Sequence, residues 1–221
     1  GILATASAML AELYRKDPRG FVMDRAVKDQ LILTCRPVSI LMATILKSKG
    51  ISARVRSGFA PYFANYGDKS IDHWVNEYWN EKEKRWMMID VDGAGVLEKF
   101  DPFDIPPHTF DYAADAWFIS RNRQIDPHHF WNAMPGTGFM IIAWELFYDF
   151  HCLMNSEIIY PYHPRICSAD IFSTLKEEEL KQIDHLARLI QNPDDNFDEL
   201  MQIWNTNKDF RMLKGLLLYG T

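Results

Sequence analysis

The feature that most constrains the fold is a long apolar segment that begins just after a cysteine, from Thr34 to Gly50. Its apolar residues recur every three or four positions, the spacing of one helix face: Val38, Leu41, Met42, Ile45 and Leu46. Thr34 suits the N-cap position, and Pro37 falls in the first turn, where its missing N–H removes no hydrogen bond. Basic residues followed by Gly50 suit the helix end. The sequence therefore predicts a buried helix with Cys35 in its first turn.

Cys35 at this place has two interpretations. At the positive end of the helix dipole a thiol is shifted toward the thiolate, which is the form that attacks carbonyl carbon. The position is therefore typical of a nucleophilic cysteine. The alternative is a small buried hydrophobe, which is the commoner role of a lone cysteine beside an apolar helix.

Composition and charge limit the classes of protein that this chain can belong to. The chain has 221 residues, of which 48% are hydrophobic and 24% charged, which suits one globular domain with an extension. The net charge of −6 and the lack of a basic run argue against a nucleic-acid partner. The apolar stretches are too short to span a membrane, and no signal peptide is visible.

The cysteines indicate the compartment. Cys35, Cys152 and Cys167 are too few for a disulfide framework and lack the spacing of a zinc site. We therefore expect a reducing, cytoplasmic compartment, with no metal and no cofactor.

After the cysteine helix, two stretches alternate between polar and apolar residues, as strands do, and a third is largely apolar. Ala53–Phe59, His73–Trp79 and Arg85–Val91 predict three strands, the last two joined by the charged hairpin loop Asn80–Lys84. A helix followed by such strands predicts an α+β core, in which the helix packs on a three- or four-stranded antiparallel sheet.

The rest of the chain has mainly helical periodicity. Helices are expected over Ile2–Arg15, Tyr112–Ser120, Phe139–Met154, Leu175–Ile190 and Phe197–Trp204, with a loop over Asp126–Gly138. We expect a core over residues 1–106 and a mainly helical extension over 107–221, packed together as one compact unit. Glu145 and Asp149 are four residues apart in one expected helix, which suits a solvated or capped face as well as an acid/base pair.

Three chemically active residues mark the ends of the expected elements. Cys35 opens the helix, His73 opens the second strand and Asp90 ends the third, with gaps of 38 and 17 residues. A hairpin places the start of one strand near the end of the next, so His73 and Asp90 can be neighbours. An imidazole beside a thiol takes its proton, and a carboxylate behind the imidazole orients it. Alternatively, His73 is a structural histidine and Asp90 caps a turn, while Asp92 is a rival for Asp90.

These residues lie in motifs that resemble those of transglutaminase-like proteins. The motifs are Thr34–Arg36 with Lys49–Phe59 for the cysteine, Asp72–Tyr78 for the histidine and Trp86–Asp90 for the aspartate. They occur in the family's order over roughly residues 29–92. The resemblance implies the papain-like cysteine-protease architecture, with Cys35 as nucleophile, His73 as base and Asp90 as orienting acid.

A closer resemblance is to a bacterial transglutaminase-like subgroup of unestablished substrate. Phe100–Pro106 and Asp115–Trp117 are similar to segments of that subgroup. Pro37 stands where many members carry an acidic residue, and Val91 replaces the usual proline. Both departures leave the triad intact and the choice of substrate open.

The expected function is thiol-dependent acyl transfer or amide hydrolysis through an acyl-enzyme, on a peptide or small amide. The Cys35 backbone N–H and the Gln30 side chain are the candidate oxyanion donors. Trp74, next to His73 in the same motif, is the candidate substrate-binding residue. The alternative is an inactive transglutaminase-like module that binds a peptide or protein partner in the cleft.

Overall fold

The computed structural model describes the chain except residues 1, 2, 4, 64–67, 94–98, 133–135, 160, 161, 212 and 216–221. The chain divides into two compact units: the first is Gly1–Val55 with Trp74–Ile105, and the second is Arg56–His73 with Pro106–Thr221. Strands β1 (Ala53–Ala60) and β2 (Ser70–Asn80) each contribute residues to both units. The division between Ile105 and Pro106 lies next to the expected one, but no sequence pattern indicated that 56–73 groups with the second unit. The assignment of 1–106 and 107–221 as two parts stays a prediction.

The first unit begins with helix α1 (Ala6–Lys16), which packs against α2 (Cys35–Ser48). The Thr5 hydroxyl caps α1 by accepting the Ala8 N–H at 3.2 Å, so the helix starts later than the expected Ile2. A short 3-10 helix, η1 (Val27–Asp29), lies between the two helices.

Helix α2 begins at the predicted residue, but its most buried face is not the predicted one. Thr34 occupies the N-cap position in extended conformation, without the expected capping bond from its hydroxyl. The buried residues of α2 are Arg36, Ser39, Ile40 and Ala43, while the five apolar residues of the predicted face are half-buried. Apolar periodicity missed this face because two of its four residues are polar.

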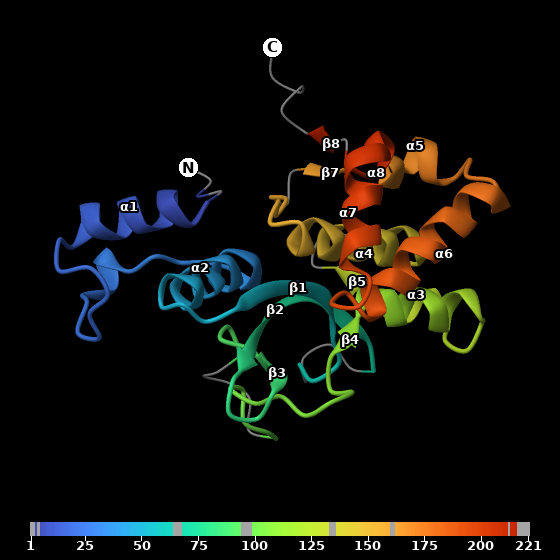
Figure 1. Cartoon of the computed structure of the whole chain (residues 1–221). Coiled ribbons are helices and arrows are strands. Elements are labelled where there is room, and N and C mark those ends of the chain that lie inside the picture. The colour runs from blue at the N-terminus through green and yellow to red at the C-terminus, as the bar shows by residue number, and fades with distance from the viewer. Residues whose placement is uncertain are drawn as a thin grey trace, which may run out of the picture. The chain divides into compact units, whose positions relative to one another are not determined.

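Strand β2 pairs with β3 (Arg85–Ile89) in the predicted antiparallel hairpin (Figure 1). The register runs from Asn76 opposite Ile89 to Asn80 opposite Arg85. Beyond β3 the chain turns back along the strand, because the Asp90 N–H donates to the Pro102 carbonyl at 2.8 Å. Helices and strands combine as the expected α+β class requires, which confirms the predicted fold class.

The second unit holds short strands that the sequence did not predict. Strand β4 (Asp111–Tyr112) pairs antiparallel with β1, and β5 (Phe130–Asn132) pairs parallel with the start of β2. Strand β6 (Gly136–Thr137) pairs antiparallel with β5. The expectation of a loop over Asp126–Gly138 was therefore wrong, because strands of two or three residues carry no periodicity of their own. The parallel pair also departs from the expected purely antiparallel sheet.

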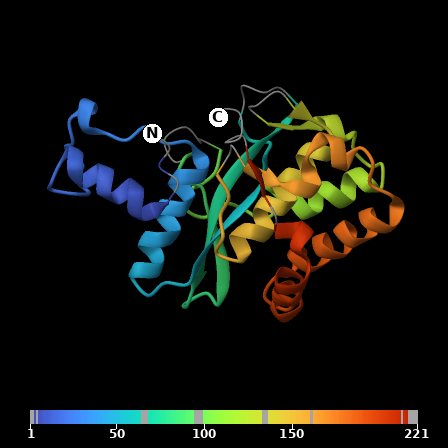
Figure 2. The ribbon, with the colours of Figure 1, turned by 90° about the horizontal axis from the view of Figure 1, so that it is seen from above.

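Helices form most of the second unit. They are α3 (Ala113–Arg121), α4 (Phe139–Leu153), α5 (Ala169–Phe172), α6 (Glu177–Gln191), α7 (Phe197–Thr206) and α8 (Lys208–Arg211). Helix α3 packs against α4 and α6, and the three lie side by side in Figures 1 and 2. The remaining elements are the 3-10 helices η3 (Pro127–His129) and η4 (Arg165–Cys167) and the paired strands β7 (Tyr162–Pro164) and β8 (Leu213–Gly215).

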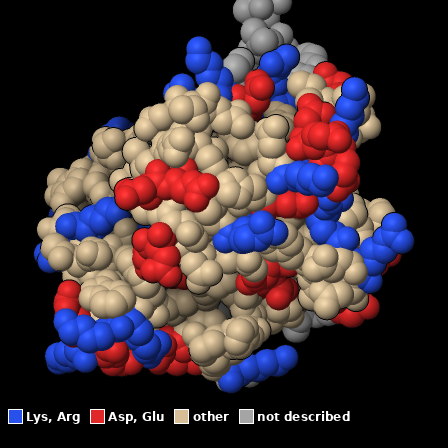
Figure 3. Space-filling model, turned by 45° about the vertical axis from the view of Figure 1, so that its right-hand side comes forward, with Lys and Arg blue, Asp and Glu red and all other residues tan. Residues whose placement is uncertain are grey.

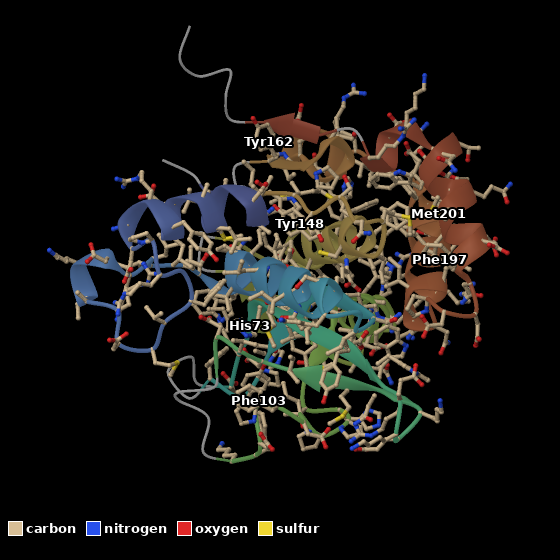
Figure 4. All side chains as sticks on the ribbon, turned by 60° about the vertical axis from the view of Figure 1, so that its left-hand side comes forward. His73, Phe103, Tyr148, Tyr162, Phe197 and Met201 are labelled. Carbon is tan, nitrogen blue, oxygen red and sulfur yellow. The ribbon has the colours of Figure 1, made fainter. Side chains whose placement is uncertain are left out.

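Helix α4 is buried along most of its length. The Tyr148 hydroxyl donates to the Tyr162 carbonyl at 3.0 Å, and both tyrosines are labelled in Figure 4. On α3 the buried Trp117 indole donates to Asp184 of α6 at 2.7 Å. On the face drawn in Figure 3, basic and acidic side chains are interspersed. Among the described helices, none has both the length and the apolar character needed to cross a bilayer.

A buried polar cluster joins β1 to α4 inside the second unit. Asp149 accepts hydrogen bonds from Arg56 Nε at 2.9 Å, from Arg56 Nη2 at 2.8 Å and from the Ser57 N–H at 3.0 Å. The Ser57 hydroxyl donates to the carboxylate of Glu145. Glu145 and Asp149 are both buried, so the interpretation of these residues as a solvated face was wrong. Glu145 and Asp149 instead anchor β1 to α4.

Gly58 of β1 allows β4 to approach closely. A Cβ at this position would overlap the Asp111 carbonyl oxygen and lie 2.8 Å from a ring carbon of Phe110. The backbone of β4 cannot withdraw without losing its pairing with β1. We therefore expect Gly58→Ala to lower the free energy of unfolding by about 1–3 kcal/mol, the usual effect of overpacking. Urea denaturation followed by tryptophan fluorescence measures the change, and an unaltered midpoint would contradict it.

Candidate active site

Cys35 is the first residue of α2 and is half-buried. A helix of 14 residues carries the positive end of its dipole at this residue, where it favours a thiolate. None of the three cysteines forms a disulfide, and Cys152 and Cys167 are buried. Burial raises the pKa of the Cys167 thiol well above its ordinary value. Cys35 is therefore the cysteine best placed to react.

His73 lies in β2 and is buried. The ring of Phe63 meets the imidazole edge-on with 5.0 Å between centroids, and the ring of Tyr62 does so at 6.3 Å. These aromatic contacts, on the residue labelled in Figure 4, restrict the orientation of the imidazole. A fixed orientation is what a general base requires.

Asp90 follows β3 directly and is fully buried. Its Oδ1 accepts the Gly93 N–H at 2.8 Å, so it also caps a turn, as the alternative interpretation held. Asp92, the rival candidate, is exposed. A buried carboxylate held by backbone groups is the better candidate for orienting an imidazole.

Two residues of β2 contact α2 within the first unit. The Arg36 guanidinium lies 5.7 Å from the Trp74 ring centroid, and Asn76 Nδ2 donates to the Ser39 carbonyl.

Continuing the β2–β3 register by one residue sets Val75 opposite Asp90. The sequence predicts that His73 and Asp90 can be neighbours, and their pairing stays a prediction. Strand β2 begins at Ser70, three residues before the predicted start.

The remaining predicted site residues have the following places. The Cys35 N–H belongs to the first turn of α2, whose N–H groups have no acceptor within the helix. Gln30 is exposed, and its Nε2 donates to the Arg25 carbonyl at 3.5 Å. Trp74 is buried. The oxyanion and substrate-binding assignments stay predictions.

Sequence reasoning missed Ser39 and Asn76, two buried polar residues that link α2 to β2. Ser39 follows Cys35 by one helix turn, and this spacing in an otherwise apolar segment was the available signal. Among the described residues, no three or more His, Cys, Asp or Glu side chains are grouped so as to hold a metal ion.

Comparison with known proteins bears on the same stretch. Residues 17–91 match a family model described as the transglutaminase-like superfamily. The match covers about a third of the chain, and we call these residues the transglutaminase-like segment. The transglutaminase-like segment includes Cys35, His73 and Asp90 and ends before α3. Proteins of this superfamily are usually cysteine-dependent acyltransferases or peptidases. Searches of curated proteins and of solved structures gave no significant match.

Proposed function

We propose that this chain is a cysteine-dependent enzyme that transfers the acyl group of a peptide or small amide to water or to an amine. Cys35 is the nucleophile, His73 the base and Asp90 the residue that orients His73. The convergence of these three side chains is part of the proposal. The absence of a disulfide among the three cysteines suits a reducing compartment such as the cytoplasm.

In the proposed reaction the Cys35 thiol gives its proton to His73, and the sulfur forms a bond to the amide carbonyl carbon. The carbon–nitrogen bond then breaks, the leaving amine takes the proton from His73, and a thioester remains. Water or a second amine attacks the thioester, and its proton passes through His73 to the departing sulfur. Water yields a carboxylic acid, whereas an amine yields a new amide.

The observation that carries this proposal is the position of Cys35 at the first residue of a long helix within the transglutaminase-like segment. The N–H groups of that turn suit the negative charge that develops on the carbonyl oxygen. The pairing of β2, which carries His73, with β3, which Asp90 follows directly, supports the assignment of these two residues to one site.

Alkylation of the native protein by iodoacetamide between pH 5 and 9, read by peptide mass, tests the proposal. An activated Cys35 is expected to react with a midpoint at least one unit below the ordinary thiol value of ~8.5. Cys152 and Cys167 serve as internal references and are expected to react slowly, because both are buried. Slow, equal labelling of all three would favour the alternative, a module that binds a peptide or protein without cleaving it.

A further inference from the structure

Two hydrogen bonds between buried groups join α2 to β2 within the first unit. Ser39 Oγ donates to the Trp74 carbonyl at 2.8 Å, and Asn76 Nδ2 donates to the Ser39 carbonyl at 2.9 Å. Ser39 is 3% exposed and Asn76 is fully buried. We call Ser39, Trp74 and Asn76 the α2–β2 clamp.

The clamp holds a polar group that stability alone does not explain. Asn76 Nδ2 must face the Ser39 carbonyl, because only the NH₂ end of the amide donates. Asn76 Oδ1 is then buried, with no hydrogen-bond partner in the part of the chain that the structure describes. An unpaired buried acceptor costs about 1–3 kcal/mol, which an apolar side chain of similar size would avoid. The amide therefore has a role other than adding to stability.

The place of the clamp indicates that role. Ser39 lies one helix turn after Cys35, about 6 Å along the axis of α2. Trp74 is bonded directly to His73. The two hydrogen bonds thus fix where along β2 the start of α2 lies. A displacement of about 1 Å in a catalytic constellation can lower a rate by about a hundredfold.

We propose that Ser39 and Asn76 are positioning residues, whose two hydrogen bonds hold the start of α2, and with it the Cys35 thiol, in its working position along β2. This inference rests on the proposed function. Neither residue touches the substrate.

Ser39→Ala and Asn76→Leu test the inference, each assayed by the pH profile of Cys35 alkylation and by thermal unfolding. Ser39→Ala removes the bond to Trp74. Asn76→Leu removes the bond to Ser39 together with the unpaired Oδ1, so its thermal stability is expected to equal or exceed that of the wild type. Thr44→Val is the matched control, because the Thr44 hydroxyl donates to Ile40 at 2.8 Å within α2 and does not reach β2.

Both clamp variants are expected to lower the alkylation rate of Cys35 at pH 6 by about tenfold or more, the effect of one unit of thiol pKa. Thr44→Val is expected to keep the wild-type profile. The inference is overturned if the clamp variants keep the wild-type profile, or if Thr44→Val moves it as far as they do. If Ser39→Ala fails to fold, Asn76→Leu still decides the question, because this variant is expected to remain folded. If the wild type itself reacts only near pH 8.5, the proposed function fails, and the inference falls with it.

Discussion

Asp149→Ala is expected to lower the free energy of unfolding by about 3–5 kcal/mol, the largest stability effect we predict for a single replacement. The substitution leaves the Arg56 guanidinium buried without the carboxylate that accepts two of its N–H groups. It also removes the acceptor of the Ser57 N–H at 3.0 Å. Rehydrating these donors requires opening the packing between β1 and α4. Urea denaturation followed by far-ultraviolet circular dichroism measures the loss.

An exposed ion pair of the same chemistry provides the control. Arg85 Nη2 lies 2.9 Å from Asp104, with side chains that are 42% and 41% exposed, against 4% and 0% for Arg56 and Asp149. Asp104→Ala is expected to cost at most about 1 kcal/mol, because water replaces the lost partner. Equal losses for Asp104→Ala and Asp149→Ala would show that burial does not set the strength of the Arg56 pair.

A double replacement measures the effect of removing the whole ion pair rather than one of its charges. Combining Arg56→Met with Asp149→Leu removes both charges and fills much of the space. Much of the stability lost in Asp149→Ala is then expected to return, because the greater penalty is that of one charge left alone. A double variant less stable than Asp149→Ala would contradict this account.

The same cluster shows where sequence reasoning reaches its limit. Helix α4 was predicted over its full length, because its apolar residues are dense. Periodicity could not decide whether Glu145 and Asp149 face water or a partner. The partners, Arg56 and Ser57, lie about ninety residues earlier in the chain and have no local link to α4. Only the tertiary structure pairs them.

The candidate site, too, could be predicted only in part. Cys35 and the β2–β3 hairpin follow from a cap, an apolar helix and strict alternation, and the structure places them within a few residues of the prediction. The α2–β2 clamp did not follow, since Ser39 and Asn76 read as interruptions of apolar patterns. The short strands β4, β5 and β6 depend on pairing with other strands, and short sequence segments do not reveal these partners.

His73→Ala is expected to lower the alkylation rate of Cys35 at pH 6 by about a hundredfold or more. In the proposed pair a protonated imidazole stabilises the thiolate, which is the form that iodoacetamide alkylates. Without the imidazole this stabilisation is lost, so less of the thiol reacts at pH 6. The alkylation midpoint therefore moves upward in pH. At pH 9, where the thiolate is the main form in both proteins, the two rates are expected to converge.

Two further variants show whether the loss is specific to the imidazole. His128→Ala removes an exposed histidine of η3, whose Nδ1 lies 2.9 Å from Asp126, and is expected to leave the profile unchanged. Asp90→Asn keeps the shape of the side chain but removes its charge, so it is expected to move the midpoint upward by less than His73→Ala. Wild-type labelling by a folded His73→Ala protein would exclude His73 as the base. Asp72, the neighbouring titratable group on the other face of β2, would then be the next residue to replace.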